Sequence, residues 1–190
     1  MKKNSNITGI ILAGGKSIRM GRDKGLMLYK NKPFIKHIIE ALQPVVSEII
    51  IVSNSNKYDH FKIKRVNDII KNAGPLAGVY TGLHHSKTEN NLVLSCDIPL
   101  INTETLQNLV NEIDGVSEII QIESMQKTMP LIALYKKQCA ATFLNLLNDG
   151  ERRLRVAVNK CNVKTVKLNS ESDEYVMNIN TKDQFYELKN

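Results

Sequence analysis

Short apolar runs and helical patterns alternate along this sequence, and their order predicts the class of fold. Continuous apolar runs, typical of strands that a parallel sheet buries on both faces, occupy residues 7–12, 48–52 and 91–95. Between them, apolar residues recur at helical spacing over 33–42, and a second helix is expected over 76–84. This alternation predicts an α/β fold, a three-layer α/β/α sandwich around a mainly parallel sheet.

The remaining strands and helices are predicted from shorter sequence patterns. A short strand is expected over 63–66 after a polar loop at 53–60, and Thr103 is expected to cap a helix through Val110. The second half predicts strands at 117–122, 129–135 and 162–168, the middle one a candidate for antiparallel pairing, and helices at 137–147, from near Gly150 and from Thr181. No repeat or linker divides these elements, so one domain spanning 1–190 is expected.

The loops that follow the predicted strands are expected to meet. Right-handed crossovers place the connections after parallel strands along one edge of the sheet, where such folds bind their ligands. The loops in question are those at 13–24, 53–56, 67–75 and 96–99. A common crevice lined by these four segments is therefore the expected site.

The first strand leads into a glycine-rich basic loop, LAGGKSIRMGRDKGL at residues 12–26. Its GGKS centre is not a P-loop, because the residue five places before Gly15 is isoleucine rather than glycine. The glycines at 14, 15 and 21 do not fit the dinucleotide motif G-x-G-x-x-G either. Adjoining glycines still let a ligand approach the backbone, and Arg19 and Lys24 supply positive charge. A polyphosphate is therefore the expected ligand.

Charge and cysteine content narrow the classes of function. The net charge is +7, yet the lysines are spread over the whole chain, and no aromatic platform motif supports nucleic-acid binding. Three widely spaced cysteines, at 96, 139 and 161, favour a reduced setting over disulfide pairing. No apolar run suits a signal peptide or approaches the ~20 residues of a membrane span. We therefore expect a cytoplasmic protein with neither a membrane nor a nucleic acid as partner.

Two aspartates follow predicted strands at the same edge. Asp97 comes at the end of a central strand, where a carboxylate can hold a Mg²⁺ that bridges phosphate oxygens. The alternative role for Asp97 is an Asx cap before Pro99. Asp68 follows another strand and strengthens the first interpretation, because it adds a second carboxylate beside the basic loop.

Three further segments are candidates for ligand contacts, each with a structural alternative. AGPLAG at 73–78 places a Gly-Pro turn at a helix start, and Gly78 costs about 1 kcal/mol inside a helix unless something packs close to it. DGERRLR at 149–155 is either a phosphate clamp or a solvated helix face. NINT at 178–181 is a ligand loop or, more simply, the N-cap of the last helix.

Taken in order, the motifs LAGGKSIRMGRDKGL, GPLAG, CDIP, GERR and NINT resemble those of the molybdenum cofactor guanylyltransferases, which have a Rossmann-like nucleotidyltransferase fold. The resemblance covers about residues 7–188. It implies transfer of GMP from GTP to the terminal phosphate of molybdenum-molybdopterin, with Mg²⁺ as cofactor and pyrophosphate as leaving group. It also implies transient contacts with proteins that make or accept the molybdenum cofactor.

Roles for individual residues follow from the same resemblance. It implies that Arg19 holds the β- and γ-phosphates, that Lys24 lies on the α-phosphate and that Asp97 binds Mg²⁺. The GTP pocket then comprises, with Lys24 and Asp97, the residues Leu12, Ala13, Gly14, Gly15, Asn54 and Asp68. Positions that match the molybdopterin half of the site are Gly74, Gly78, Arg153, Asn178 and Asn180.

The sequence departs from the family pattern at two places and leaves alternatives open. Met129-Pro130 stands where the family often has His-Pro, and Asn31 replaces a turn glycine, a mild change because asparagine tolerates left-handed φ. A CTP-dependent cytidylyltransferase for the same cofactor is the nearest rival, but such enzymes tend to read LAAG, so Gly14 favours guanine. A sugar-phosphate nucleotidyltransferase usually needs a longer chain. A GTP-binding accessory protein without turnover is disfavoured by the intact Arg19, Lys24 and Asp97.

Overall fold

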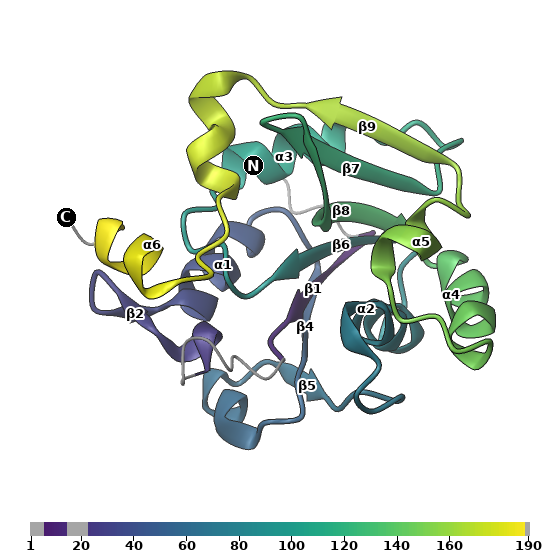
Figure 1. Cartoon of the computed structure of the whole chain (residues 1–190), viewed down its shortest axis with the longest axis horizontal. Helices are drawn as coiled ribbons and strands as arrows, with labels where there is room; N and C mark the ends of the chain where they lie inside the picture. The colour runs from purple at the N-terminus through teal and green to yellow at the C-terminus, as the bar shows by residue number, and fades with distance from the viewer. Residues whose placement is uncertain (1–5, 15–22, 189–190) are drawn as a thin grey trace.

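A central β-sheet with helices on both faces forms the molecule (Figure 1), as a computed structural model of residues 6–14 and 23–188 shows. Within these residues the sheet has seven strands in the order β5-β4-β1-β6-β8-β7-β9. The strands are β1 (Ile7–Leu12), β4 (Glu48–Val52), β5 (Lys64–Val66), β6 (Asn90–Ser95), β7 (Ile119–Ser124), β8 (Lys127–Lys136) and β9 (Val163–Lys167). β8 alone among them runs antiparallel to its neighbours, so the predicted mainly parallel sheet is confirmed.

The helices cover the sheet as two layers, each with its own apolar core. They are α1 (Phe34–Leu42), α2 (Gly74–His85), α3 (Thr103–Asn111), α4 (Cys139–Asn148), α5 (Leu154–Val158) and α6 (Lys182–Glu187), with short 3-10 helices η1 (Lys24–Leu26), η2 (Asn56–Phe61) and η3 (Ser170–Val176). One core joins α1 and α3 to one sheet face, and the other joins α2, α4 and α5 to the opposite face. The three-layer prediction is confirmed. Within the described residues, no helix has the length and apolarity to cross a membrane.

The order of the strands creates a switch point beside β1. After β1 the chain adds β4 and β5 on one side of it and then returns to place β6 on the other. Leu12, the last residue of β1, is in register with Val52 of β4 and with Ser95 of β6. The carboxyl ends of the three strands therefore lie next to one another, where open α/β sheets bind ligands.

Two predicted helix starts are off by two residues, since α2 begins at Gly74 and α4 at Cys139. Two others are wrong for a reason that the hydrogen bonds show. The helix expected near Gly150 begins only at Leu154, because Glu151 accepts the backbone N–H groups of Arg152 and Arg153 and holds this segment in an irregular turn. The cap of α3 is Asn102, whose side chain accepts the N–H of Thr105 at 2.8 Å. In both cases a side chain next to the predicted helix start accepts backbone N–H groups close to that start, and so changes where the helix begins.

The chain also forms elements that the sequence patterns did not indicate. A small hairpin pairs β2 (Leu28–Tyr29) with β3 (Lys32–Pro33), and η2 occupies most of the loop expected at 53–60. Lys30 and Asn31 form the hairpin turn with φ of 47° and 61°. Asn31 thus adopts the left-handed conformation expected for the residue that replaces the family glycine.

Gly82 lets α2 lie directly on β1. A Cβ at this position would stand 2.4 Å from Cγ2 of Ile10, which is fully buried. We expect Gly82→Ala to lower the free energy of unfolding by about 1–3 kcal/mol, the usual cost of overpacking, although alanine favours helices. Urea unfolding measures the change. Gly78→Ala is the comparison, because its Cβ would meet only the flexible end of Leu12 at 3.3 Å, and an equal loss at both positions would contradict this explanation.

Candidate active site

A cleft of about 1100 Å³ opens at the carboxyl edge of the sheet, beside the switch point. Its described lining comes from the ends of β1, β4 and β6, η1 and its cap, the β5–α2 loop, the start of α2, one residue of β8 and the segment before α6. The lining residues are Leu12, Ala13, Gly14, Asp23, Lys24, Val52, Ser53, Asn54, Ser55, Asp68, Asn72, Ala73, Gly74, Pro75, Gly78, Ser95, Cys96, Asp97, Leu131 and Asn180. The predicted meeting of four loops in one crevice is thus confirmed.

Lys24 is the point at which three distant segments converge. Its Nζ donates to Oδ2 of Asp97 at 3.1 Å and to Oδ1 of Asn180. The side chains of Lys24 and Asp97 are only 17% and 16% exposed, so water screens this ion pair less than a surface pair. The contact brings together the turn at the end of the basic loop, the end of β6 and the segment that precedes α6.

Asp97 faces the cleft rather than serving as a turn cap. The hydroxyl of Ser95 donates to its Oδ1, while Lys24 donates to its Oδ2. The backbone carbonyl of Asp97 accepts the N–H of Ile179 at 2.8 Å, which docks the segment before α6 against the end of β6. The carboxylate is therefore held from both sides and directed at the same space as Lys24.

Asn54 and Asp68 form a reciprocal pair on the β4–β5 side of the cleft. The amide of Asn54 donates to Oδ2 of Asp68 at 2.8 Å, and its Oδ1 accepts the backbone N–H of Asp68 at 3.0 Å. Burial raises the pKa of the Asp68 carboxyl, and the bond from Asn54 works in the opposite direction. The pair presents hydrogen-bonding groups of defined orientation, which suits recognition of a base or ribose edge.

The cleft glycines differ in what surrounds them. Among the described residues, nothing lies within 4 Å of a Cβ built on Gly14, so this part of the described wall is open to a ligand. Gly74 has φ of +69° and lies beside the carbonyl oxygen of Arg152. Gly78 lies against Leu12, which is the close contact that its position inside a helix implied.

The segment NINT caps the last helix, as the simpler alternative predicted, and one of its residues also lines the cleft. Thr181 is the N-cap of α6 in a capping box with Gln184, whose Oε1 also accepts the N–H of Asn180 at 2.8 Å. The side chain of Asn180 meanwhile reaches Lys24. The capping box therefore fixes the backbone from which Asn180 enters the cleft.

Two of the predicted site residues that the structure describes, Arg153 and Asn178, are not gathered at the cleft. Gly15 and Arg19 lie outside the described residues. Asn178 is half-buried, and Arg153 has a side chain 77% exposed and paired with Glu151 at 2.6 Å; neither lines the described cleft. The predicted arginine clamp is not assembled, because its members have separate partners: Arg152 donates to the Leu147 carbonyl, Arg153 to Glu151 and Arg155 to Thr128.

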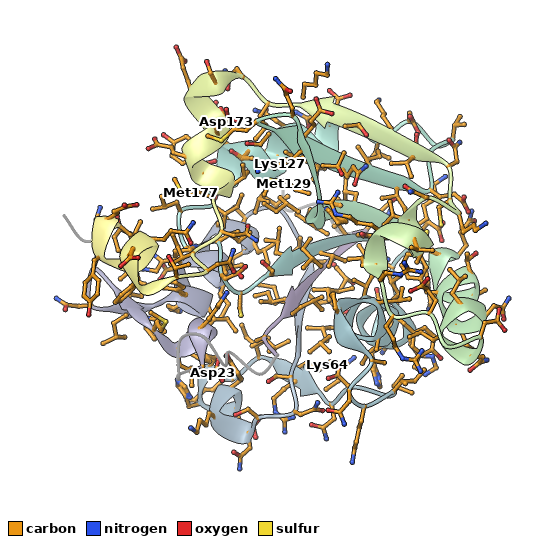
Figure 2. The ribbon with its side chains drawn as sticks, viewed as in Figure 1. Asp23, Lys64, Lys127, Met129, Asp173 and Met177 are labelled. Atoms are coloured by element: carbon orange, nitrogen blue, oxygen red, sulfur yellow. The ribbon has the colours of Figure 1, made fainter. Side chains whose placement is uncertain are left out.

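Sequence reasoning missed the residues beneath Lys24. Asp23 lines the cleft next to it, and Oδ1 of Asp23 accepts both the N–H of Gly25 and the hydroxyl of Tyr58. Figure 2 labels Asp23 close to the segment that carries η2. The Asp-Lys pair within the basic motif could have indicated Asp23, but no local sequence pattern indicated Tyr58.

The residues present fit a Mg²⁺ that binds together with phosphate. Within the described part of the chain, no three His, Cys, Asp or Glu residues cluster as metal ligands. Mg²⁺ is usually held by one or two carboxylates plus phosphate oxygens and water. Asp97 supplies one carboxylate, and each of its oxygens has a further lone-pair site beside the bonds from Ser95 and Lys24.

Comparison with known proteins assigns the family. The family described as "MobA-like NTP transferase domain" matches residues 9–164. A probable molybdenum cofactor guanylyltransferase from Flavobacterium johnsoniae is 38% identical over 182 residues, which cover 96% of each chain. A molybdenum cofactor guanylyltransferase from Vibrio parahaemolyticus is 32% identical over 97% of this chain and 95% of its own. The chain belongs to the molybdenum cofactor guanylyltransferase family.

A solved structure supports the assignment of the fold. The molybdopterin-guanine dinucleotide biosynthesis protein A from Archaeoglobus fulgidus aligns with a TM-score of 0.81, at 21% identity and over 96% of each chain. Identity at this level shows the fold alone, and it is the predicted Rossmann-like nucleotidyltransferase fold. The chain is thus a nucleotidyltransferase in both sequence family and architecture.

One departure from the guanylyltransferase pattern now has a structural setting. Met129, labelled in Figure 2, stands on β8 two residues after Lys127. It is partly buried against the apolar core that α1 and α3 share with the sheet, and it does not line the described cleft. At this position the chain therefore uses an apolar contact with the core.

Proposed function

We propose that this protein transfers GMP from GTP to the terminal phosphate of molybdenum-molybdopterin, releasing pyrophosphate and forming the guanine dinucleotide form of the cofactor. The observation that carries the proposal is the double contact of Lys24, with Asp97 on one side and Asn180 on the other. The family resemblance implies that Asp97 belongs to the nucleotide half and Asn180 to the pterin half. A single cation between them stands where the two phosphates would have to meet.

Three groups of residues would hold the nucleotide: one at the base, one at the α-phosphate and one at the β- and γ-phosphates. Leu12, Ala13 and Gly14 form the open wall at the end of β1, and the Asn54–Asp68 pair offers oriented groups to the base or ribose. Lys24 would neutralise the α-phosphate, and Gly15 and Arg19 would complete the binding of the β- and γ-phosphates. Charge developing at the α-phosphorus is thereby matched by a preplaced cation.

The acceptor half would lie towards the start of α2 and the segment before α6. Gly74 and Gly78 line the wall formed by the start of α2, and Asn180 approaches from the opposite wall. Arg153 and Asn178 would join on binding, since both belong to segments that adjoin this end of the molecule. Arg153 would first have to leave its exposed pair with Glu151, a pair of the kind that is worth little in water.

The chemistry requires alignment rather than a general base. An oxygen of the pterin phosphate attacks the α-phosphorus, and the bond to the bridging oxygen breaks with its electron pair leaving on pyrophosphate. The nucleophile is already an anion, and in the described chain no histidine lines the cleft. Lys24, Asp97 and Asn180 would therefore act by orienting two anions and reducing their repulsion.

Asp97, as the cleft carboxylate beside Lys24, would hold the Mg²⁺ cofactor. When bound, this ion neutralises phosphate charge and orients the pyrophosphate leaving group. Release of Oδ2 from Lys24 would free the lysine for the α-phosphate at the same time. The resting ion pair thus keeps two opposite charges partly buried until their ligands arrive.

The proposal extends to location and partners. GTP and molybdenum-molybdopterin are the substrates, and transient contacts with proteins that make or accept the cofactor follow from the reactivity of the product. The reduced cysteines 96, 139 and 161 suit a cytoplasmic location. No membrane or nucleic-acid partner is proposed.

Thermal unfolding with each nucleotide tests the proposal. With Mg²⁺ present, GTP at 100 times its Kd is expected to add about 2.7 kcal/mol of stability, whereas CTP, ATP and UTP add little. A transfer assay with molybdopterin and GTP, which measures pyrophosphate release and the dinucleotide product, then follows. Stabilisation and transfer with CTP would identify a cytidylyltransferase instead. GTP binding without transfer would identify an accessory protein.

A further inference from the structure

We propose that Tyr58 is a positioning residue for Lys24, and that it links the base-binding side of the cleft to the phosphate-binding lysine. This inference rests on the proposed function. The observation behind it is a buried tyrosine whose hydroxyl lies inside the turn that carries Lys24. Tyr58 does not line the described cleft, so it would act only through Asp23 and Gly25.

The first contact is with Asp23. Tyr58 is 0% exposed, and its hydroxyl donates to Oδ1 of Asp23. The same oxygen accepts the N–H of Gly25 at 3.2 Å, so one carboxylate caps the η1 turn and is itself held by the tyrosine. Lys24 lies between Asp23 and Gly25, and its backbone is therefore fixed on both sides.

The second contact explains why residue 25 is glycine. A Cβ built on Gly25 would lie 2.5 Å from the Tyr58 hydroxyl oxygen and 3.2 Å from its ring carbons. The turn closes over the tyrosine with no room for a side chain. Position and orientation of Lys24 are thus set by the fit between Gly25 and Tyr58 as well as by hydrogen bonds.

The tyrosine itself is held by the nucleotide side of the cleft. Tyr58 belongs to η2, which starts two residues after Asn54 and is capped by Ser55. Arg65 fixes this helix further, because it donates to the side chain of Asp59 at 2.6 Å and to the carbonyl of Ser53 at 2.8 Å. One hydrogen-bonded segment therefore carries Asn54 at the cleft and Tyr58 against the lysine turn.

The protonation state suits this role. Burial, together with the hydrogen bond to the Asp23 carboxylate, raises the pKa of the Tyr58 hydroxyl well above its ordinary value. Tyr58 is therefore protonated, and able to donate this hydrogen bond, at neutral pH.

Tyr58→Phe tests the inference, because it removes only the hydroxyl. We expect kcat for GMP transfer to fall about tenfold while KM for GTP changes by less than about twofold, since Lys24 loses alignment that matters most in the transition state. The matched control is Tyr135→Phe, which removes another fully buried hydroxyl, donated to the Pro130 carbonyl at 2.6 Å. Both variants should lose similar stability, and only Tyr58→Phe should lose turnover.

A second measurement does not depend on turnover. Lysines methylated with ¹³C are followed by NMR, and the Lys24 signal is assigned by its absence from Lys24→Arg. We expect this signal to shift in Tyr58→Phe and in Gly25→Ala but not in Tyr135→Phe. An unchanged Lys24 signal together with wild-type kcat in Tyr58→Phe would overturn the inference. Absence of GMP transfer by the wild type would overturn the proposed function instead, while the NMR comparison would still decide the role of Tyr58.

Discussion

Asp97→Ala is expected to abolish Mg²⁺-dependent GMP transfer, lowering kcat by at least about 10³-fold, while the protein stays folded. Asp97 is the carboxylate that the cleft holds beside Lys24, between the donors Ser95 and Lys24. Its removal takes away both the proposed metal ligand and the negative charge that orients Lys24. Pyrophosphate release at saturating GTP and Mg²⁺ measures the loss.

The control for Asp97 separates charge from packing. Asp97→Asn keeps the size of the side chain and an oxygen that can accept from Ser95, but it carries no charge. It should be nearly as inactive as Asp97→Ala and should unfold at a temperature close to that of the wild type. Full activity of the alanine variant would remove Asp97 from the metal-binding role.

Lys24→Ala is expected to lower kcat by about 10²–10³-fold, with a smaller effect on KM for GTP. Lys24 is the described cation that contacts both Asp97 and Asn180, so it stands between the proposed halves of the active site. Removing it would leave the repulsion between the two phosphates uncompensated as they approach. Steady-state kinetics with each substrate varied in turn measure the separate effects.

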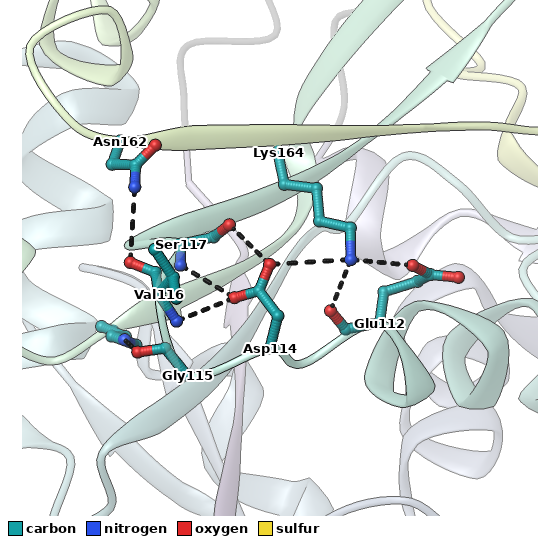
Figure 3. Close-up of polar contacts among 8 residues, drawn as sticks. Glu112, Asp114, Gly115, Val116, Ser117, Asn162 and Lys164 are labelled. Atoms are coloured by element: carbon teal, nitrogen blue, oxygen red, sulfur yellow. Dashed lines mark hydrogen bonds and ion pairs between the residues drawn. The ribbon is translucent and has the colours of Figure 1, made fainter.

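Lys164→Ala is the matched control. Lys164 also pairs with carboxylates, Glu112 at 3.0 Å and Asp114 at 3.6 Å, in the network that Figure 3 shows. It stands near the start of β9, in register with Ile120 of β7, and it does not line the described cleft. This variant should keep wild-type kcat. An unchanged kcat in Lys24→Ala would contradict the role assigned to that lysine.

Much of the fold could be predicted because its signals are local. The runs at β1, β4 and β6 are apolar because parallel strands are buried on both faces, and each run alone identifies its strand. Errors occurred where a neighbouring side chain captured the backbone, as Glu151 does before α5 and Asn102 does before α3. Such competition is decided by a few hydrogen bonds and leaves little trace in apolar periodicity.

The candidate site could be predicted to the extent that its residues follow strands. Ala13, Asn54, Asp68 and Asp97 all come soon after a strand of the parallel group, so the topology sends them to one edge. For Asn180 no comparable rule applied, because it precedes a short helix late in the chain. Its place in the cleft depends on the capping box of α6 and on the bond from Ile179 to the Asp97 carbonyl.

The sequence by itself determined the order of the main-sheet strands and the α-helices, the basic glycine loop and the carboxylates at the strand ends, since each depends on neighbours along the chain. Only the tertiary structure decided that Lys24 meets Asn180, 156 residues away, and that the Tyr58 hydroxyl fills the space left by Gly25. Contacts of this kind depend on how crossovers bring distant segments together and on how their side chains fit. That fit cannot be predicted from periodicity or motif spacing.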